Sequence, residues 1–396
     1  MRIETQAETN ASRWASEADK RGRPFAAADT VPGRRGDEEL RTGDMRTSIS
    51  IAMATYNGEK FLREQLESLA HQTRLPLELV VCDDCSSDKT VEILREFAAS
   101  APFPVRLHRN EANLGYSDNF FKAAGLCRGE WIAFCDQDDV WLPNKLARVS
   151  QAISGVPGDE LMLVAHTSLI ADENLEPTGQ RAPNFRRDVR MPRAGRFAAF
   201  CIVGFSLVCR ATLVREIDPA SRPVSYWGEG RRPTGHDDWI SVLANALGDS
   251  IYISEPLAIW RRHRQSMTSL DFISRTVWAE ENLKGKVRAS LASVKSEPYR
   301  LLGKVLSANA GAFAKLSETV KREKLKARLA SAASGNAALA QKLLRRAEMY
   351  DCATPIQRLR ALMRLLASNA YSGPKYCSLG LKSFAKDLAF ALGVIG

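Results

Sequence analysis

The sequence predicts an α/β protein with a mainly parallel sheet flanked by helices and a helical C-terminal region. Two observations predict it. Between residues 48 and 166, short apolar runs alternate with segments whose apolar residues follow helical spacing. Strand–helix–strand order needs crossover connections, which build parallel sheets covered on both faces. From residue 271 onward Lys, Arg, Ala and Leu dominate, which predicts helices throughout.

The expected elements follow one another closely along the first half of the chain. Strands are expected at 48–54, 77–82, 105–108, 131–135 and 161–166, and helices at 59–70, 89–99, 117–126 and 143–153. A polar stretch at 171–196 precedes a strand-like run at 200–209. A flexible loop at 227–235 precedes a helix that starts near Asp237, and an apolar run covers 251–259.

Composition divides the chain into three parts. Residues 1–46 are polar and rich in Gly and Pro near 22–36, which predicts a disordered extension, and Met45 is a candidate start. Residues 47–270 hold the α/β pattern. Residues 271–396 contain 22 Lys and Arg against 9 Asp and Glu, so the excess positive charge of the chain lies there. Such a basic region favours an anionic surface, either membrane or nucleic acid.

The strongest chemical signal is the acidic cluster that follows the apolar run 131–135. Asp136, Asp138 and Asp139 lie within four positions. Carboxylates this close repel one another unless a cation or a donor-rich ligand neutralises them. A hard divalent ion with phosphate oxygens is a natural partner at the carboxyl end of a buried strand. The alternative is a solvated acidic turn before the next helix, with Pro143 at its first position.

Other polar segments also follow predicted strands. Tyr56, in Thr55-Tyr56-Asn57-Gly58, is placed to stack on a base, although Asn-Gly is also an ordinary turn. Asp83 and Asp84 are placed to accept hydrogen bonds from a base or ribose, while Ser87 or Asp88 nearby is a good helix N-cap. Asn113-Leu114-Gly115 precedes a helix whose N–H groups can face anionic oxygens.

Two further segments complete the pattern. His236-Asp237-Asp238-Trp239 follows the flexible loop, where a carboxylate is a candidate general base or simply a helix cap. Trp260-Arg261-Arg262-His263 follows the apolar run 251–259. Its arginines could hold phosphates and its histidine could bind a metal, or the segment is a solvated basic turn.

In this order, the segments resemble the GT-A glycosyltransferases, specifically the family 2 inverting enzymes of the rhamnosyltransferase-like, cell-surface polysaccharide type. The resemblance covers roughly 48–270, and Asp-Gln-Asp-Asp-x-Trp at 136–141 is its most specific part. It implies a Rossmann-like GT-A domain at 47–270. It also implies a nucleotide-sugar donor, a saccharide or lipid-linked acceptor, and Mg²⁺ or Mn²⁺ as cofactor.

The resemblance also assigns roles to individual residues. The general base would be Asp237, or Asp238, which stands where the family often has an aromatic residue. The metal ligands would be Asp136, Asp138 and His263. The donor-binding residues would be Ala54, Tyr56, Asp83, Asp84, Asn113, Asp136 and Arg261.

Three other functions fit the sequence less well than glycosyl transfer. A sugar-nucleotide pyrophosphorylase would need a Gly-rich phosphate loop after the first strand, which 54–60 does not supply. A catalytically silent nucleotide-sugar-binding protein would not need Asp136, Asp138 and Asp237. A nucleic-acid binder would show aromatic residues among the basic charges of 271–396, and few are present.

The remaining expectations concern location. Eight cysteines, mostly within apolar runs and without metal-ligand spacing, indicate free thiols in a reducing cytoplasm. Amphipathic basic patterns at 356–366 and 381–395 fit either an anionic membrane surface, at the inner face of the cell membrane, or packing on the catalytic domain or a partner.

Overall fold

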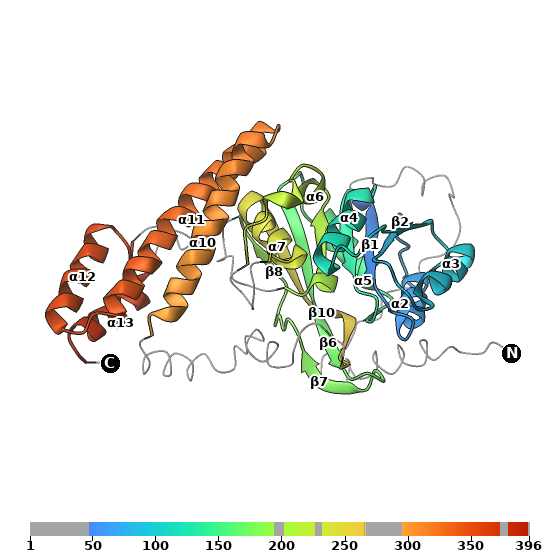
Figure 1. The fold of residues 1–396 in the computed structure, drawn as a ribbon, viewed down its shortest axis with the longest axis horizontal. Coiled ribbons are helices and arrows are strands. Elements are labelled where there is room, and N and C mark those ends of the chain that lie inside the picture. The colour runs from blue at the N-terminus through green and yellow to red at the C-terminus, as the bar shows by residue number, and fades with distance from the viewer. Residues whose placement is uncertain are drawn as a thin grey trace.

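The computed structural model describes residues 47–193, 202–225, 232–264, 266, 295–372 and 379–394. Within them a ten-stranded sheet runs in the order β3-β2-β1-β4-β9-β6-β10-β5, with β7 paired to β6 and β8 to β10 (Figure 1). The strands are β1 Ile49–Thr55, β2 Glu78–Asp83, β3 Val105–Arg109, β4 Trp131–Cys135, β5 Val140–Trp141, β6 Leu161–Ala171, β7 Pro177–Arg181, β8 Val189–Met191, β9 Leu207–Arg210 and β10 Asp249–Arg261.

Strand direction determines which chain segments meet at the functional edge of the sheet. Strands β3, β2, β1 and β4 pair in parallel. Strand β9 is antiparallel to both β4 and β6, and β10 is parallel to β6. Strands β6 and β10 therefore run in the same direction as β1, β2 and β4. The carboxyl ends of all these strands lie at one edge, where α/β sheets bind ligands.

Helices cover both faces of the sheet. The helices of this part are α2 Leu62–Ala70, α3 Thr90–Ser100, α4 Tyr116–Leu126, α5 Lys145–Ser154, α6 Thr212–Arg215 and α7 His236–Leu247. Alternate residues of β1 enter different cores, because side chains along a strand point to opposite faces. Ile51 and Met53 join the core under α2, α3 and α5, and Ala52 joins the core under α4 and α7.

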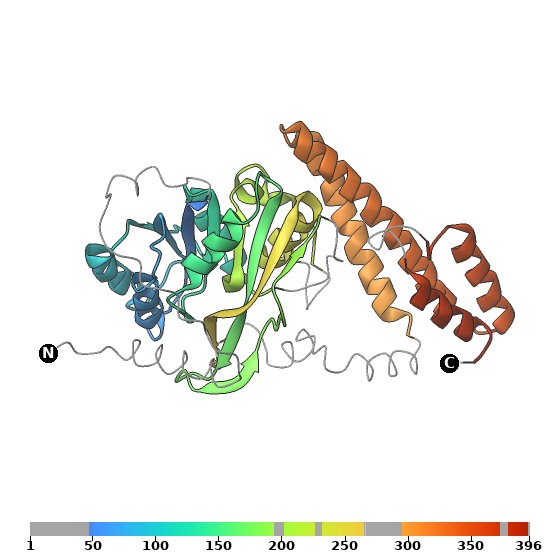
Figure 2. The ribbon, with the colours of Figure 1, turned by 180° about the vertical axis from the view of Figure 1, so that it is seen from behind.

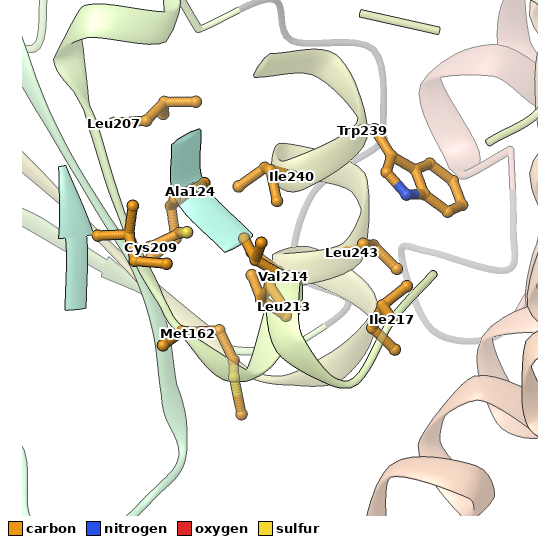
Figure 3. Packing of buried hydrophobic residues seen from close by; sticks show 14 of the residues in the cluster. Ala124, Met162, Leu207, Cys209, Leu213, Val214, Ile217, Trp239, Ile240 and Leu243 are labelled. Atoms are coloured by element: carbon orange, nitrogen blue, oxygen red, sulfur yellow. The ribbon is translucent and has the colours of Figure 1, made fainter. Parts of the chain in front are cut away.

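The core under α7 extends to the C-terminal helices. Ile240 of α7 lies on the side of Leu207 and Cys209 of β9, while Trp239 points to the opposite side (Figure 3). The Trp239 ring stacks on Phe313 with the ring centroids 6.0 Å apart. Burial of these rings joins the helical region to the α/β unit through an apolar contact.

The C-terminal region consists of helices in the residues that the structure describes. They are α10 Glu297–Thr319, α11 Glu323–Tyr350, α12 Pro355–Ala367 and α13 Leu381–Ala391. Helices α10 and α11 form a long hairpin, and α12 and α13 lie at its end remote from the sheet (Figures 1 and 2). Among the described helices, none combines the length and the apolar character that crossing a bilayer requires.

The predicted fold class is confirmed, with differences in detail. The sheet is parallel from β3 to β4 and mixed beyond β4. The polar stretch 171–196 contains β7 and β8, which sequence patterning missed because edge strands with exposed residues show no apolar alternation. Helix α5 begins at Lys145, so Pro143 lies in the preceding turn rather than at the first helical position.

Some expectations fall on other parts of the chain. The extension 1–46 and residues 267–294 lie outside the described residues, as do 226–231 of the predicted loop. The division into three domains at 46 and 270 stays a prediction.

Candidate functional site

The predicted functional residues lie at the carboxyl edge of the sheet. Asp136 and Asp138 follow β4, His263 follows β10, and Asp237 lies in the first turn of α7. Distant segments meet here because the strands that carry them run in the same direction. The resulting surface brings carboxylates and one imidazole to the place where a ligand would bind.

Asp136 occupies the centre of this acidic cluster. It is partly buried. Burial, together with the neighbouring charges of Asp138 and Asp237, raises the pKa of Asp136 well above its ordinary value, and Lys145 opposes that rise. Asp237 acts on Asp136 although the two residues lie about a hundred positions apart in the sequence. An added cation would relieve this repulsion.

Asp138 and His263 form a pair. The Asp138 Oδ2 atom lies 2.8 Å from His263 Nε2. The His263 ring also packs on Phe61, with the ring centroids 4.7 Å apart. A carboxylate and an imidazole held together at the carboxyl edge of the sheet are a suitable pair of protein ligands for a divalent cation.

Arg261 lies below this pair and is engaged by protein groups. Its Nε atom donates to the Asp138 carbonyl at 2.7 Å, and its backbone N–H donates to Asp139 Oδ1 at 3.0 Å. The guanidinium also contacts the Glu64 carboxylate and the Glu173 carbonyl. These contacts point to a structural role that fixes the 138–139 backbone. Donor binding by Arg261 stays a prediction.

The loop after β1 is tied to the acidic segment by Gln137. Tyr56 N–H donates to Gln137 Oε1 at 2.9 Å, and Gln137 Nε2 donates to the Tyr56 carbonyl at 3.0 Å. A Cβ atom at Gly58 would lie 2.3 Å from Gln137 Oε1, so the pairing requires glycine there. Tyr56 is 52% exposed just after β1, and its predicted stacking on a base stays a prediction. Ala54 is partly buried in β1, and its predicted contact with the donor stays a prediction too. Sequence reasoning missed Gln137.

Asp83 and Asp84 hold the neighbouring loops. Asp83 accepts from Ser86 N–H at 3.0 Å. Asp84 accepts from the N–H groups of Leu114 and Gly115 at 2.8 and 2.9 Å. Both carboxylates are buried. Their contacts show how the loop that follows β3 is shaped, and their predicted contacts with base and ribose stay predictions.

Asn113 supports the same loop. Its Nδ2 atom donates to the Asp84 carbonyl at 3.1 Å, and its Oδ1 atom accepts from Gly115 N–H. The residue is exposed. A side chain on the surface of a loop shaped by Asp84 is accessible to a donor, and this role too stays a prediction.

Asp237 and Asp238 both lie in the first turn of α7. The charge of Asp237 contributes to the raised pKa of Asp136. The Asp237 carboxylate also accepts from Asp238 N–H at 2.9 Å. A carboxylate in the first turn of a helix is stabilised by the helix dipole. The choice of Asp237 over Asp238 as the general base stays a prediction.

His236 forms the inner wall beside Asp237. It is buried, and its ring stacks on Phe120 with the centroids 4.2 Å apart. Burial lowers the pKa of His236, which favours a neutral ring at neutral pH. A Cβ atom at Gly204 would lie 2.6 Å from His236 Nε2, so this ring occupies the space that glycine leaves. This packing orients the start of α7.

Lys145 is a fully buried cation that sequence reasoning missed. Its Nζ atom donates to the Phe205 carbonyl at 2.7 Å and lies 3.3 Å from the Trp141 ring centroid. Burial lowers the pKa of Lys145 to about 7, while Cys135, Asp139 and Asp136 act in the opposite direction. One signal was available, since Lys145 falls on the apolar face that Val149 and Ile153 define.

The donor set fits a divalent cation that is shared with a ligand. Within the described parts of the chain, no group of three or more His, Cys, Asp or Glu side chains is arranged to hold a metal by itself. Asp138 and His263 supply one carboxylate and one imidazole. Mg²⁺ and Mn²⁺ commonly complete their coordination with water and substrate phosphates. The arrangement therefore suits an ion that arrives with a diphosphate.

Comparison with known proteins finds similarity to one family of enzymes. Residues 50–212 match the model of glycosyl transferase family 2. An uncharacterised protein of Mycobacterium tuberculosis is 30% identical over 220 residues, covering 54% of this chain and 59% of that protein. The dTDP-rhamnosyl transferase of Shigella flexneri is 36% identical over 98 residues, covering 24% of this chain and 34% of that protein.

A third relative is named for a lipid-linked acceptor. It is the Escherichia coli UDP-Glc:alpha-D-GlcNAc-diphosphoundecaprenol beta-1,3-glucosyltransferase, 39% identical over 98 residues. These residues cover 25% of this chain and 38% of that protein. The chain spans about 59% of the length of the mycobacterial relative. Residues 50–212 are thus similar to the catalytic domains of family 2 glycosyltransferases.

Proposed function

We propose that the protein is a metal-dependent inverting glycosyltransferase. It moves a hexosyl or rhamnosyl group from a nucleoside-diphosphate sugar to a hydroxyl acceptor in cell-surface polysaccharide or glycolipid synthesis. The observation that carries the proposal is the meeting of Asp136, Asp138, Asp237 and His263 at one edge of the sheet. The similarity to family 2 supports it, and the names of the Shigella and Escherichia relatives suggest the kinds of donor and acceptor.

The donor would lie across the carboxyl ends of β1, β2 and β4. Tyr56 would stack on the base, because its ring is exposed above the loop that Gln137 fixes. Asp136, Asp138 and His263 would hold Mg²⁺ or Mn²⁺ against the diphosphate, with the ion completed by phosphate oxygens and water. The bound ion would supply charge neutralisation for the leaving nucleoside diphosphate. Asp136 would face the donor sugar.

Transfer would be a single in-line displacement. Asp237 takes the proton of the acceptor hydroxyl as that oxygen attacks the anomeric carbon. The bond between the anomeric carbon and the diphosphate oxygen breaks on the opposite face, and the nucleoside diphosphate leaves with the electron pair. Attack and departure on opposite faces invert the anomeric configuration. Lys145 lies beneath these carboxylates and offsets part of their charge.

We infer a reducing cytoplasm as the location. The six cysteines within the described residues are all free thiols, and Cys82, Cys127, Cys135 and Cys209 are buried. Burial raises the pKa of Cys82 to about 11, which keeps this thiol protonated and unreactive. Nucleotide sugars are expected as donors in that compartment, and nucleic acid is not expected as a partner.

A donor screen tests the proposed function. UDP-, dTDP- and GDP-sugars are incubated with the full chain and Mn²⁺ or Mg²⁺, and release of the nucleoside diphosphate is measured. We expect slow hydrolysis of one donor class that EDTA abolishes. Asp237→Asn should bind this donor without turning it over. If no nucleotide sugar is bound or hydrolysed with either ion, the proposed function is wrong.

A further inference from the structure

The C-terminal helices expose an apolar stripe on α12. Ile356, Leu359, Met363 and Leu366 are 68%, 45%, 58% and 39% exposed. Spacings of three and four residues place them on one side of the helix. Soluble surfaces rarely gather large apolar side chains in this way without a binding partner. We call these residues, with Arg360 and Arg364, the α12 face.

A neighbouring side of α12 is already packed. Leu362 and Leu365 are buried in a small core with Met349, Tyr350 and Phe390. The capping box of Thr354 and Gln357 fixes the start of the helix. The α12 face is therefore a second apolar surface of the helix, separate from the side that is buried when the protein folds.

A buried polar network holds α13 in place at this end of the hairpin. Asp387 of α13 is fully buried and accepts from Arg346 Nε at 2.9 Å and Tyr371 Oη at 2.7 Å. Tyr350 also donates to Asp387. A buried carboxylate needs such partners, and their loss would leave an uncompensated charge. The network therefore fixes α13, and the core around it, on α11.

Within the residues that the structure describes, the α/β unit does not cover the α12 face. The opposite end of the hairpin docks there, where Lys324 pairs with Asp159 at 2.8 Å and Arg328 donates to the Leu247 carbonyl. Helix α11 has 28 residues and is thus about 42 Å long. Figures 1 and 2 show α12 at the far end of this arm. The contacts with the α/β unit are made by α10 and α11. Packing on the catalytic domain or a partner was predicted for 356–366 and 381–395, and it stays a prediction.

The charge around the stripe indicates what covers it. Helix α12 carries three arginines and no acidic residue, and the single acid of α13 is the buried Asp387. Arg360 and Arg364 are exposed and adjoin the apolar stripe. No ion pair among the described residues involves either of them. A second copy of the chain would bring a second set of these arginines to the contact and no acidic residue of α12 to pair with them, because a twofold contact joins identical patches.

We propose that the α12 face binds an anionic membrane surface. Its apolar side chains enter the boundary between head groups and acyl chains, and Arg360 and Arg364 reach lipid phosphates. Each basic residue near an anionic bilayer strengthens binding about fivefold. The hairpin then holds the sheet at a distance from that surface. This binding is independent of the glycosyl-transfer chemistry proposed above.

Vesicle flotation of the full chain tests this proposal. Vesicles of phosphatidylglycerol with phosphatidylcholine are compared with vesicles of phosphatidylcholine alone, at low and high salt. We expect flotation with the anionic vesicles that salt weakens. Arg360→Gln with Arg364→Gln should weaken it roughly 25-fold. Ile356→Ser with Met363→Ser should weaken it by at least about tenfold, because exposed apolar area no longer leaves water.

Matched controls lie on the α/β unit. Leu75→Ser with Leu77→Ser removes similarly exposed apolar side chains, and Arg95→Gln removes an exposed charge. These variants should float like the natural chain. Absence of flotation, or equal flotation of all variants, would overturn the proposal. So would a concentration-dependent dimer that the Ile356→Ser/Met363→Ser variant abolishes, because a second copy would then cover the face. Sugar-nucleotide hydrolysis, measured in parallel, reports separately on the active site.

Discussion

Asp138 Oδ2 and His263 Nε2 lie 2.8 Å apart although 125 residues separate them in the chain. The contact exists because β4 and β10 run in the same direction and end at the same edge of the sheet. Arg261, which lies two residues before His263 at the end of β10, fixes the backbone of 138–139. The pair is thus a product of sheet topology, supported from below by a buried arginine.

This pair predicts ion-dependent binding of a nucleoside diphosphate. Asp138→Asn and His263→Ala should each weaken binding of UDP or dTDP in the presence of Mn²⁺ by at least about tenfold, because each removes a ligand of the ion. Isothermal titration with Mn²⁺ and with EDTA separates the ion-dependent part. His71→Ala, which changes an exposed histidine at the end of α2, serves as the control. An unchanged Mn²⁺ effect in both site variants would remove the metal assignment.

The position of Asp237 beside Asp136 predicts a selective loss of turnover. Asp237→Asn should lower kcat by about 10²–10⁴-fold, because the acceptor hydroxyl loses its proton acceptor. Donor affinity should change little, since the carboxamide keeps the shape of the side chain. Asp238→Asn is the matched comparison and should retain most of the activity. If only the Asp238 variant loses turnover, the base has been assigned to the wrong residue.

The Gln137–Tyr56 pairing predicts coupling between two substitutions. Gly58→Ala displaces the Gln137 amide, because the new Cβ would lie 2.3 Å from its Oε1 atom. Gln137→Ala loses the same two hydrogen bonds, and each variant should lower the free energy of unfolding by about 1–2 kcal/mol. The double variant should cost less than the sum of the two.

Urea unfolding of the four proteins measures this coupling. Gly125→Ala is the control, because nothing lies within 4 Å of its added Cβ in α4. It should leave stability unchanged or raise it slightly. Full additivity of the Gly58 and Gln137 effects would show that the two residues do not depend on each other.

The lowered pKa of Glu78 predicts that the protein loses stability in acid. Burial acts to raise its pKa, but the Arg128 N–H, the Arg106 guanidinium and the Ser50 hydroxyl outweigh burial and lower the pKa below its ordinary value of 4.5. The unfolded chain therefore binds the proton more readily than the folded chain. The stabilisation is complete above about pH 4.5 and disappears as the pH falls through the lower folded pKa.

Glu78→Gln checks the sign of this effect. The variant should be less stable than the natural chain at neutral pH, and the difference should shrink as the pH falls below about 4.5. Thermal unfolding across this range measures it. Glu92→Gln, at an exposed site on α3, should show no such convergence. A stability difference that does not vary with pH would contradict the assigned pKa shift.

Sequence patterning anticipated the elements that position the site. The apolar runs at 48–54, 77–82 and 131–135 became β1, β2 and β4, each within one residue at either end. Long apolar runs identify buried strands because both faces of a parallel sheet must leave water. The antiparallel strands β7 and β8 were not predicted, because their exposed side chains show no such apolar pattern. Prediction succeeded where burial was greatest.

Sequence alone also placed Asp136 and Asp138 after a strand, because carboxylates that follow a buried apolar run have to lie at the edge of the sheet. It placed Asp237 at the start of a helix. It could not show that Asp84 and Arg261 are engaged by protein groups, or that Lys145 lies buried beneath the acids. It also left open which amphipathic face of the C-terminal helices stays in water. Those outcomes depend on contacts between segments far apart in the chain. Periodicity reports that a side chain is apolar or charged, and only tertiary packing decides which partner it meets.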